Sequence, residues 1–175
     1  MTDLSGIERL PIIPNQPHGT CFGCGRINQF GLQMKFHSDG KKVFSKLQIP
    51  SHLSGWVEVA HGGVVSTVLD ETMAWTAIWI LKKFILTKTM TVDFLKKTPT
   101  EDFIYSEGEI TEVSEREAKV SAHLYNSEFR LCARSTSVMA VFTPEEMKKR
   151  KLLREDLIED FVREVFIDSE CSDGI

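Results

Sequence analysis

The sequence predicts an α+β domain in which a curved antiparallel sheet of about five to six strands wraps around one long central helix. Residues 61–81, HGGVVSTVLDETMAWTAIWIL, are apolar on almost every face, which is typical of a helix enclosed by protein. Alternating apolar and polar residues, the period of a β-strand, precede this segment and recur in four runs after it. Because the connections between successive runs are short, we expect antiparallel pairing.

The N-terminal part of the chain is predicted to contain an irregular arm followed by a hairpin. Residues 1–20 hold three prolines and no steady periodicity, which indicates an arm over the surface. Alternation at 32–37 and at 43–49 predicts two strands. Asp39-Gly40 lies between them and is a strong signal for a hairpin turn.

The middle of the chain is predicted to pass from a loop through the helix into strands. Residues 51–60 are expected to form the loop. Lys82 and Lys83 follow the helix, where their positive charges interact favourably with the helix dipole. Gly108 is expected to mark a bulge or kink in the strand that contains it. The expected strands after the helix are 89–94, 103–113, 118–124 and 129–142.

The C-terminal segment is predicted to form an extra amphipathic helix. Thr143 suits the N-cap, Pro144 the first helical position, and Glu146 completes a capping box. Apolar residues then recur every four positions, which favours packing on the sheet edge or on a neighbouring subunit: Leu153, Leu157, Phe161 and Val165. We therefore expect three parts, namely the arm (1–20), one domain (21–143), and a helical extension with a disordered end (144–175).

Composition and charge exclude several classes of protein. The 175 residues are 42% hydrophobic and 26% charged, with a net charge of −4, as in soluble globular proteins. Nucleic acid is not an expected partner, because the sequence has no dense cluster of Lys and Arg apart from the short run at 148–151. We expect no membrane insertion, because Asp70 and Glu71 interrupt the long apolar run. No secretory signal is visible, and four cysteines without one favour a reducing compartment, so we expect a cytoplasmic protein.

Cys21 and Cys24, in the segment CFGCGRINQFGL, have the spacing of half a zinc site. No second C-x-x-C pair occurs in the chain, and His18 or His37 would complete a site only by coincidence. We therefore expect a glycine-rich turn with two half-buried thiols and no bound metal.

The central helix carries the candidate chemical groups. Gly62 and Gly63 open it, where backbone N–H groups are unpaired and point outward. Asp70 lies about two turns further on, and a buried carboxylate is costly unless it is paired, hydrogen-bonded or used. Glu71 is the other candidate for a catalytic role, but it shares its helix face with bulky side chains, which suits packing. Glu71 could still contact a basic residue or form a hydrogen bond with His61. The face of Asp70 is formed mostly by small residues and leaves room for a ligand or a close subunit, so we prefer Asp70.

These motifs, in this order, resemble those of the hot-dog-fold acyl-CoA thioesterases. The shared features are H-G-G at 61–63 with a carboxylate nine positions after the histidine, the CFGCG segment, and the strand from Thr87 to Phe94. The branch typified by phenylacetyl-CoA thioesterase is the most similar, and the likeness runs from about Cys21 to Phe142. The resemblance implies the hot-dog fold and hydrolysis of an acyl-CoA thioester to the free acid and CoA, with no cofactor beyond the CoA of the substrate.

The resemblance also implies roles for individual residues. The backbone N–H of Gly62 or Gly63 polarises the thioester carbonyl, and Asp70 acts as general base on water or as nucleophile through an anhydride. Members of the family are homodimers, often paired into tetramers, and each site combines groups from two subunits. Further contacts to substrate or water are expected from Ser66, Thr67, Thr89, Lys96 and Lys97, the two lysines lying near the CoA.

An oxyanion site and one carboxylate suffice for this reaction, because a thiolate leaves readily. His61 is expected to orient the helix start by hydrogen bonding rather than to act as a base. Ser66 and Thr67 can bind the attacking water, but neither has the motif of an activated nucleophile.

Two other functions remain open from the sequence. Some relatives carry an asparagine shortly before H-G-G, and residues 54–60, SGWVEVA, contain none. A non-catalytic acyl-CoA or lipid-binding hot-dog module, with Asp70 in a structural role, is therefore the alternative. A dehydratase is less favoured, because no better histidine–carboxylate pair is evident. The acyl group, the carrier (CoA or acyl carrier protein) and the choice between dimer and tetramer stay open.

Overall fold

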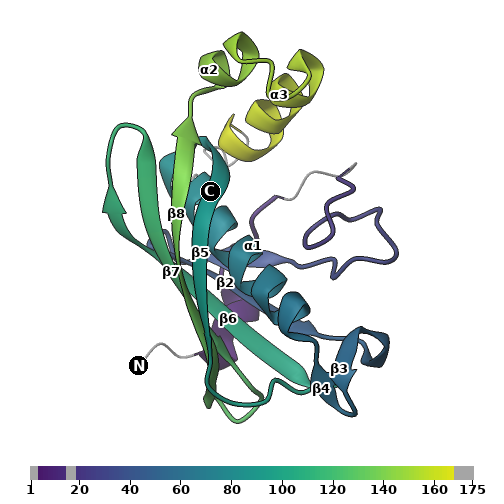
Figure 1. Ribbon diagram of the computed structural model, residues 1–175. Coiled ribbons are helices and arrows are strands. Elements are labelled where there is room, and N and C mark those ends of the chain that lie inside the picture. Colours follow the sequence, from purple (N-terminus) through teal and green to yellow (C-terminus); the bar gives the residue numbers. More distant parts are fainter. Residues whose placement is uncertain (1–3, 15–18, 168–175) are drawn as a thin grey trace.

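The computed structural model describes residues 4–14 and 19–167, and it has the predicted α+β architecture. A six-stranded sheet, with strand order β1-β2-β6-β7-β8-β5, curves around the long helix α1 (Figure 1). All of its neighbouring strands are antiparallel. The elements in chain order are η1 (Leu4–Arg9), β1 (Phe36–Ser38), β2 (Lys42–Gln48), η2 (Ser51–Leu53), β3 (Ser54–Trp56), β4 (Val59–Ala60), α1 (Gly62–Leu81), β5 (Phe84–Phe94), β6 (Phe103–Val113), β7 (Glu117–Tyr125), β8 (Leu131–Phe142), α2 (Pro144–Lys149), α3 (Glu155–Phe161) and η3 (Val162–Ile167).

The predicted strands are present, but β1 begins only at Phe36. The residues before it pair with the cysteine-containing loop instead of with β2. The Leu32 N–H donates to Phe22 O at 2.9 Å, and the Met34 N–H donates to Gly23 O at 3.0 Å. This pairing fixes the loop at 19–31 to the body of the domain.

Two other segments also differ from the sequence prediction. β5 starts at Phe84 rather than at residue 89, because its first residues already pair with the end of β8. The predicted loop at 51–60 contains the turn η2 and the short β3–β4 hairpin, and these elements lie directly before α1.

The helix α1 begins and ends where the sequence predicts. His61 is its N-cap, and Lys82 is its C-cap in the left-handed conformation, with φ of 51°. α1 is long and apolar enough to cross a membrane, but the core helix of a soluble protein can have the same length and composition. Here α1 packs against β2, β5, β6, β7 and β8, which is how the sheet buries its apolar residues.

Gly108 is expected to mark a bulge or a kink, and the structure shows no bulge at this position of β6. The strand pairs on both sides at this position, and its register shift lies further on, between Ile110 and Glu112. The missing side chain instead lets α1 approach the sheet closely. A Cβ at Gly108 would lie 2.3 Å from Thr76 Oγ1 and 3.1 Å from Thr72 O.

Buried hydroxyl groups hold α1 in this position. Thr72 Oγ1 donates to Val68 O at 2.7 Å and lies 2.8 Å from Ser106 Oγ on β6. Thr76 Oγ1 donates to Thr72 O at 2.6 Å. Because these hydroxyls are fully buried yet hydrogen-bonded, they fix the rotation of the helix at little cost.

The C-terminal segment is helical as predicted, but it is divided into α2, α3 and the π-helical turn η3. The predicted capping box at Thr143 is present. α2 then ends in a Schellman motif, because Lys151 has φ of 53°, its N–H donates to Lys148 O, and the Leu152 N–H donates to Met147 O. Leu153 therefore lies between two helices and is 45% exposed, rather than on one continuous apolar stripe.

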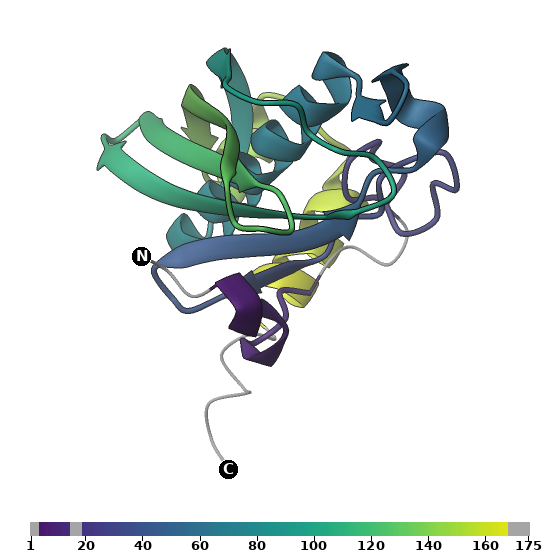
Figure 2. The same ribbon diagram turned by 90° about the horizontal axis from the view of Figure 1, so that it is seen from below.

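The divided segment packs on one end of α1 and the sheet. The Phe161 ring stacks on Trp75 of α1 at a centroid distance of 6.2 Å and lies 5.0 Å from Phe84 of β5. At the other end of the chain, η1 lies against β2 (Figure 2). Leu4 and Ile7 of η1 pack there against Phe44. The expected disordered end (168–175), Cys171, His18 and part of the arm lie outside the described residues.

We predict that Gly108→Ala lowers the free energy of unfolding by about 1–3 kcal/mol, because the added methyl group overpacks the contact between α1 and β6. Urea denaturation followed by circular dichroism measures this change. The double variant Gly108→Ala/Thr76→Ala removes the nearest clashing atom, so it should lose less stability than the two single variants together. Strictly additive losses would contradict the close-contact explanation.

Candidate active site

The start of α1 presents one backbone donor that the fold leaves unused. His61 Nδ1 accepts from the Gly63 N–H at 3.0 Å, and His61 O accepts from Val64 and Val65. Among the hydrogen bonds of the described residues, none has the Gly62 N–H as donor. Of the two glycines that the sequence offers for an oxyanion site, Gly62 therefore has the available N–H, and the histidine acts as the predicted cap.

Neighbouring segments fix the position of this helix start. The His61 N–H donates to Leu53 O of η2 at 3.0 Å, and the Ala60 N–H donates to Thr98 O at 2.9 Å. A Cβ at Gly55 would lie 3.2 Å from His61 Cα, so β3 packs closely on the cap residue. The Phe94 ring lies about 3.6 Å from the place that a Cβ of Gly62 would occupy, which leaves an apolar wall beside the exposed N–H.

Asp70 lies on the side of α1 that faces β5. Thr87 Oγ1 of β5 donates to Asp70 Oδ1 at 2.9 Å, which fixes one carboxylate oxygen and leaves the other without a hydrogen bond among the described residues. The carboxylate is half-buried, and Thr87 is exposed. The group is thus oriented and still accessible, which a base or nucleophile requires.

Ser66 and Thr67 lie between these two groups on α1. Their hydroxyls donate to the helix carbonyls of Gly62 at 2.9 Å and Gly63 at 3.0 Å. Each oxygen can still accept a hydrogen bond, so the predicted contact to a water remains chemically available.

The Gly62 N–H and the Asp70 carboxylate of one chain are too far apart to act on the same carbonyl. They are eight residues apart on one helix, which corresponds to about 12 Å along its axis. β5, which lies beside Asp70, is an edge strand of 11 residues and pairs on one side only, with β8. Such an edge offers unpaired N–H and C=O groups to another chain.

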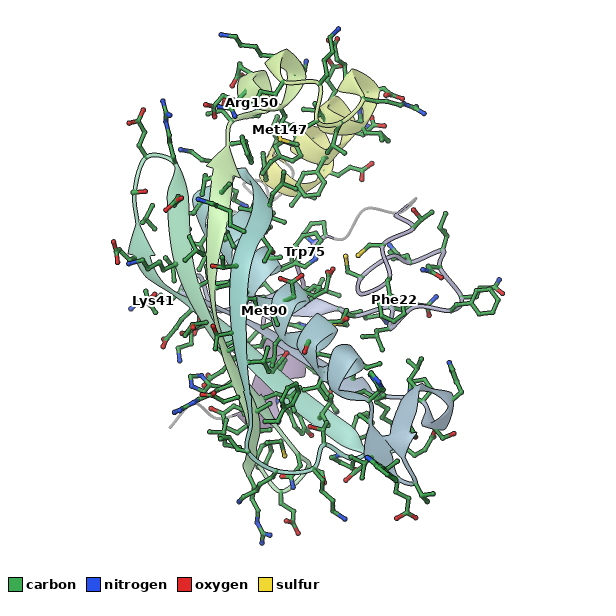
Figure 3. The ribbon with its side chains drawn as sticks, in the orientation of Figure 1. Phe22, Lys41, Trp75, Met90, Met147 and Arg150 are labelled. Atoms are coloured by element: carbon green, nitrogen blue, oxygen red, sulfur yellow. The ribbon has the colours of Figure 1, made fainter. Side chains whose placement is uncertain are left out.

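Among the described residues, Glu71 contacts neither of its two expected partners, a basic residue or His61. It contacts no basic residue in the described ion pairs and does not bond to His61; instead Cys21 Sγ donates to Glu71 Oε1 at 3.0 Å. Burial raises the pKa of the Glu71 carboxyl to about 8. No local sequence pattern predicts this contact, because the two residues are 50 positions apart. Trp75 lines the same cavity as Glu71, and Figure 3 shows Trp75 on the side of α1 that faces the loop carrying Phe22.

The remaining predicted contact residues lie at the surface around the helix start and β5. Thr89 is exposed on β5, directly after a register shift. Lys96 and Lys97 follow the end of β5 and are exposed. Lys97 lines a groove of about 820 Å³ that also includes Gly55, the residue that packs on His61.

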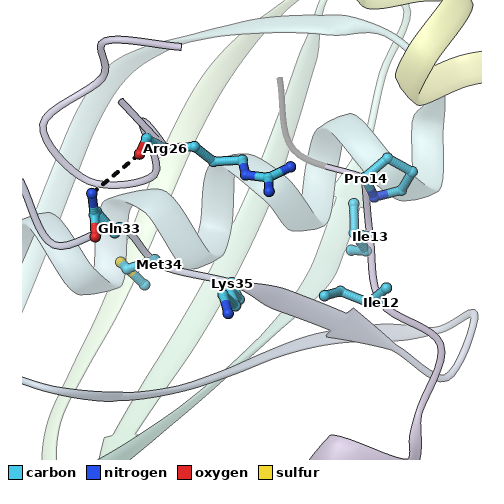
Figure 4. A pocket seen from close by; sticks show the side chains of 7 residues that line it. All are labelled: Ile12, Ile13, Pro14, Arg26, Gln33, Met34 and Lys35. Atoms are coloured by element: carbon cyan, nitrogen blue, oxygen red, sulfur yellow. Dashed lines mark hydrogen bonds between the residues drawn. The ribbon is translucent and has the colours of Figure 1, made fainter. Parts of the chain in front are cut away.

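A second cavity of about 370 Å³ lies away from these groups (Figure 4). Gln33 Nε2 donates to Arg26 O at 3.1 Å at its edge. None of its lining residues belongs to α1 or β5: Ile12, Ile13, Pro14, Arg26, Gln33, Met34 and Lys35. It brings together none of the predicted site residues.

Comparison with known proteins supports the fold. The sequence model of the thioesterase superfamily matches residues 58–133, which include the start of α1, Asp70 and β5. No curated protein matches the chain. A solved thioesterase superfamily protein is 18% identical with a TM-score of 0.63, and the match covers 67% of this chain but only 61% of that chain, less than two thirds of its length.

Two further solved structures of similar fold contain a ligand. A hypothetical thioesterase from Streptococcus pneumoniae TIGR4, solved with coenzyme A, is 21% identical with a TM-score of 0.55, covering 58% of this chain and 81% of that chain. A protein from Streptococcus mutans UA159, bound to acetyl-CoA, is 19% identical with a TM-score of 0.59, covering 63% of this chain and 89% of that chain. Residues 58–133 are therefore similar to the thioesterase superfamily in sequence, and the chain has the hot-dog fold.

Proposed function

We propose that this protein hydrolyses an acyl-CoA thioester to the free acid and CoA. The observation that carries the proposal is the unused N–H of Gly62 at the start of a helix that also holds Asp70, oriented by Thr87. The match of residues 58–133 to the thioesterase superfamily supports it. So does the similar fold of proteins solved with CoA and acetyl-CoA.

In the proposed reaction, the Gly62 N–H donates to the carbonyl oxygen of the thioester. This donor and the helix dipole stabilise the negative charge that develops on that oxygen during attack. Asp70 removes a proton from the attacking water, and the tetrahedral intermediate expels the CoA thiolate, which then takes up the proton. In the alternative route, Asp70 itself attacks, and water hydrolyses the resulting anhydride.

The active site is proposed to form between two copies of the chain. The distance of about 12 Å between Gly62 and Asp70 along one helix requires that each site takes the N–H from one subunit and the carboxylate from the other. The free edge of β5 lies beside Asp70 and provides the surface on which a second copy pairs. A homodimer is therefore the proposed functional unit, and two such dimers can combine into a tetramer.

The CoA portion is proposed to lie along the groove lined by Lys97. This groove lies next to the capped start of α1, and its lysine supplies positive charge for the phosphates of CoA. Lys96 is exposed beside it and is proposed to contribute in the same way.

We predict that Asp70→Asn lowers thioesterase turnover by about 10²–10⁴-fold, because the amide can act neither as base nor as nucleophile. Release of free thiol is measured from short- to long-chain acyl-CoAs and from phenylacetyl-CoA and benzoyl-CoA. Asp93→Asn is the matched control, because it removes another carboxylate of β5, one that pairs with Arg134. Saturable acyl-CoA binding without thiol release by the wild type would favour the binding module instead.

We predict that Gly62→Pro lowers turnover by about 10²–10³-fold, because it removes the N–H that serves the oxyanion. Proline suits the first helical position, and His61 before it has φ of −62° and ψ of 138°, which a following proline accepts. Gly62→Ala is the control: its Cβ meets only the Phe94 ring at 3.6 Å, and it keeps the N–H. Equal activity of the two variants would exclude the Gly62 N–H as the oxyanion donor.

Co-expression of Asp70→Asn and Gly62→Pro subunits tests whether the site is shared. Each mixed dimer then contains one intact site, so random assembly should restore about a quarter of wild-type activity from two nearly inactive variants. Differently tagged subunits allow the mixed dimer to be isolated and assayed. A mixed dimer without activity would show that both groups act within one subunit.

A further inference from the structure

Three donor side chains that the proposed hydrolysis does not use converge where the loop at 19–31 packs on α1. They are the thiols of Cys21 and Cys24 and the carboxylate of Glu71, and their donor atoms all lie within 4.8 Å of one another. Cys21 Sγ and Glu71 Oε1 are already 3.0 Å apart. The three residues come from two elements that the chain brings together only by folding.

The backbone of the loop is shaped to bring the thiols to the helix. A Cβ at Gly23 would lie 2.2 Å from Glu71 Cγ, so only glycine allows this approach. The Gly23 N–H donates to Cys21 Sγ at 3.3 Å, which orients that sulfur. The pairing of Leu32 and Met34 with the same loop anchors its other side.

The carboxylate of Glu71 forms no ion pair with a basic side chain in the described part of the chain. Glu71 is nevertheless half-buried. A half-buried carboxylate next to two thiols is costly to ionise alone. A divalent cation would compensate its charge and that of the thiolates.

The spacing and chemistry of the donors fit zinc. In a tetrahedral site with Zn–S distances of about 2.3 Å and Zn–O distances of about 2.0–2.2 Å, the ligand atoms are about 3.5–3.8 Å apart. The three donor atoms, all within 4.8 Å of one another, lie close to this spacing. A cavity of about 180 Å³ adjoins them and leaves room for a fourth, solvent-derived ligand; its other lining residues are Gly19, Gly25, Ala74, Trp75, Ile78 and Phe161.

We propose that Cys21, Cys24 and Glu71 bind one Zn²⁺ ion that ties the loop at 19–31 to the middle of α1. This replaces the expectation of a metal-free turn, because Glu71 supplies the third ligand that the sequence spacing did not reveal. The site is separate from the proposed hydrolysis: Glu71 follows Asp70 directly, but it faces the loop, whereas Asp70 faces β5.

Titration of the full-length, metal-free protein with Co²⁺ and then Zn²⁺, under a non-chelating reductant, tests the site. We expect one equivalent of Co²⁺ to produce sulfur-to-cobalt charge-transfer absorption and the strong visible bands of tetrahedral cobalt. One equivalent of Zn²⁺ should abolish both signals. Absence of these signals with Co²⁺ in excess over a fully reduced protein would overturn the proposal.

Variants then assign the ligands. We expect Cys21→Ser, Cys24→Ser and Glu71→Gln each to weaken Zn²⁺ binding by about tenfold or more. Cys132→Ser and Cys171→Ser should leave it unchanged, because Cys132 is buried in β8 and contacts Arg130 O, and neither residue is one of the proposed ligands. Asp70→Asn should also bind Zn²⁺ as the wild type does, which separates this test from the catalytic one. Full binding by Cys21→Ser would exclude the site.

An experiment on the unaltered protein remains valid even if a variant fails to fold. Bound Zn²⁺ should protect Cys21 and Cys24, and not Cys132 or Cys171, from alkylation that is mapped by mass spectrometry. The ion should also raise the melting temperature, because it binds the folded chain and not the unfolded one. Equal alkylation of Cys21 and Cys24 with and without Zn²⁺ would contradict the proposal.

Discussion

The close contact between α1 and β6 is the constraint on which the rest of the structure depends. Gly108 lets the helix backbone approach the strand, and the buried hydroxyls of Thr72, Thr76 and Ser106 fix the rotation of the helix there. Because α1 is one continuous helix of 20 residues, fixing its middle also sets where its first N–H groups and its two carboxylates point. The chemistry of the surface is therefore decided by a contact in the core.

Two neighbouring carboxylates receive different surroundings from this one rotation. Asp70 turns toward β5, accepts from Thr87 and stays accessible, whereas Glu71 turns toward the cysteine loop, where burial raises its pKa to about 8. Consecutive residues on a helix point about 100° apart, so Asp70 can face β5 while Glu71 contacts the loop at 19–31. The loop in turn is shaped by Gly23, which allows the backbone to lie directly on Glu71.

The domain places Asp70 and the start of α1 next to an edge strand of the sheet. β5 lies at the end of the strand order, and exposed apolar side chains such as Leu86 and Phe94 accompany it. A long, open edge of this kind is a surface for pairing with another chain. The distance between Gly62 and Asp70 along α1 also favours pairing with a second chain. In the proposed shared site, the Gly62 N–H of one helix lies close to Asp70 of the helix of a second copy.

The sequence by itself determined the α+β architecture, the helix from Gly62 to Leu81, and the preference for Asp70, because periodicity and caps are local properties. Only the tertiary structure decided that the Gly63 N–H is taken by His61 and that the Gly62 N–H is left available, since this depends on the ring orientation of the cap. It also decided that the C-terminal segment breaks at a left-handed Lys151, a position that helical periodicity does not mark. The contact of Glu71 with Cys21 joins residues 50 positions apart, and no local pattern encodes such a distance.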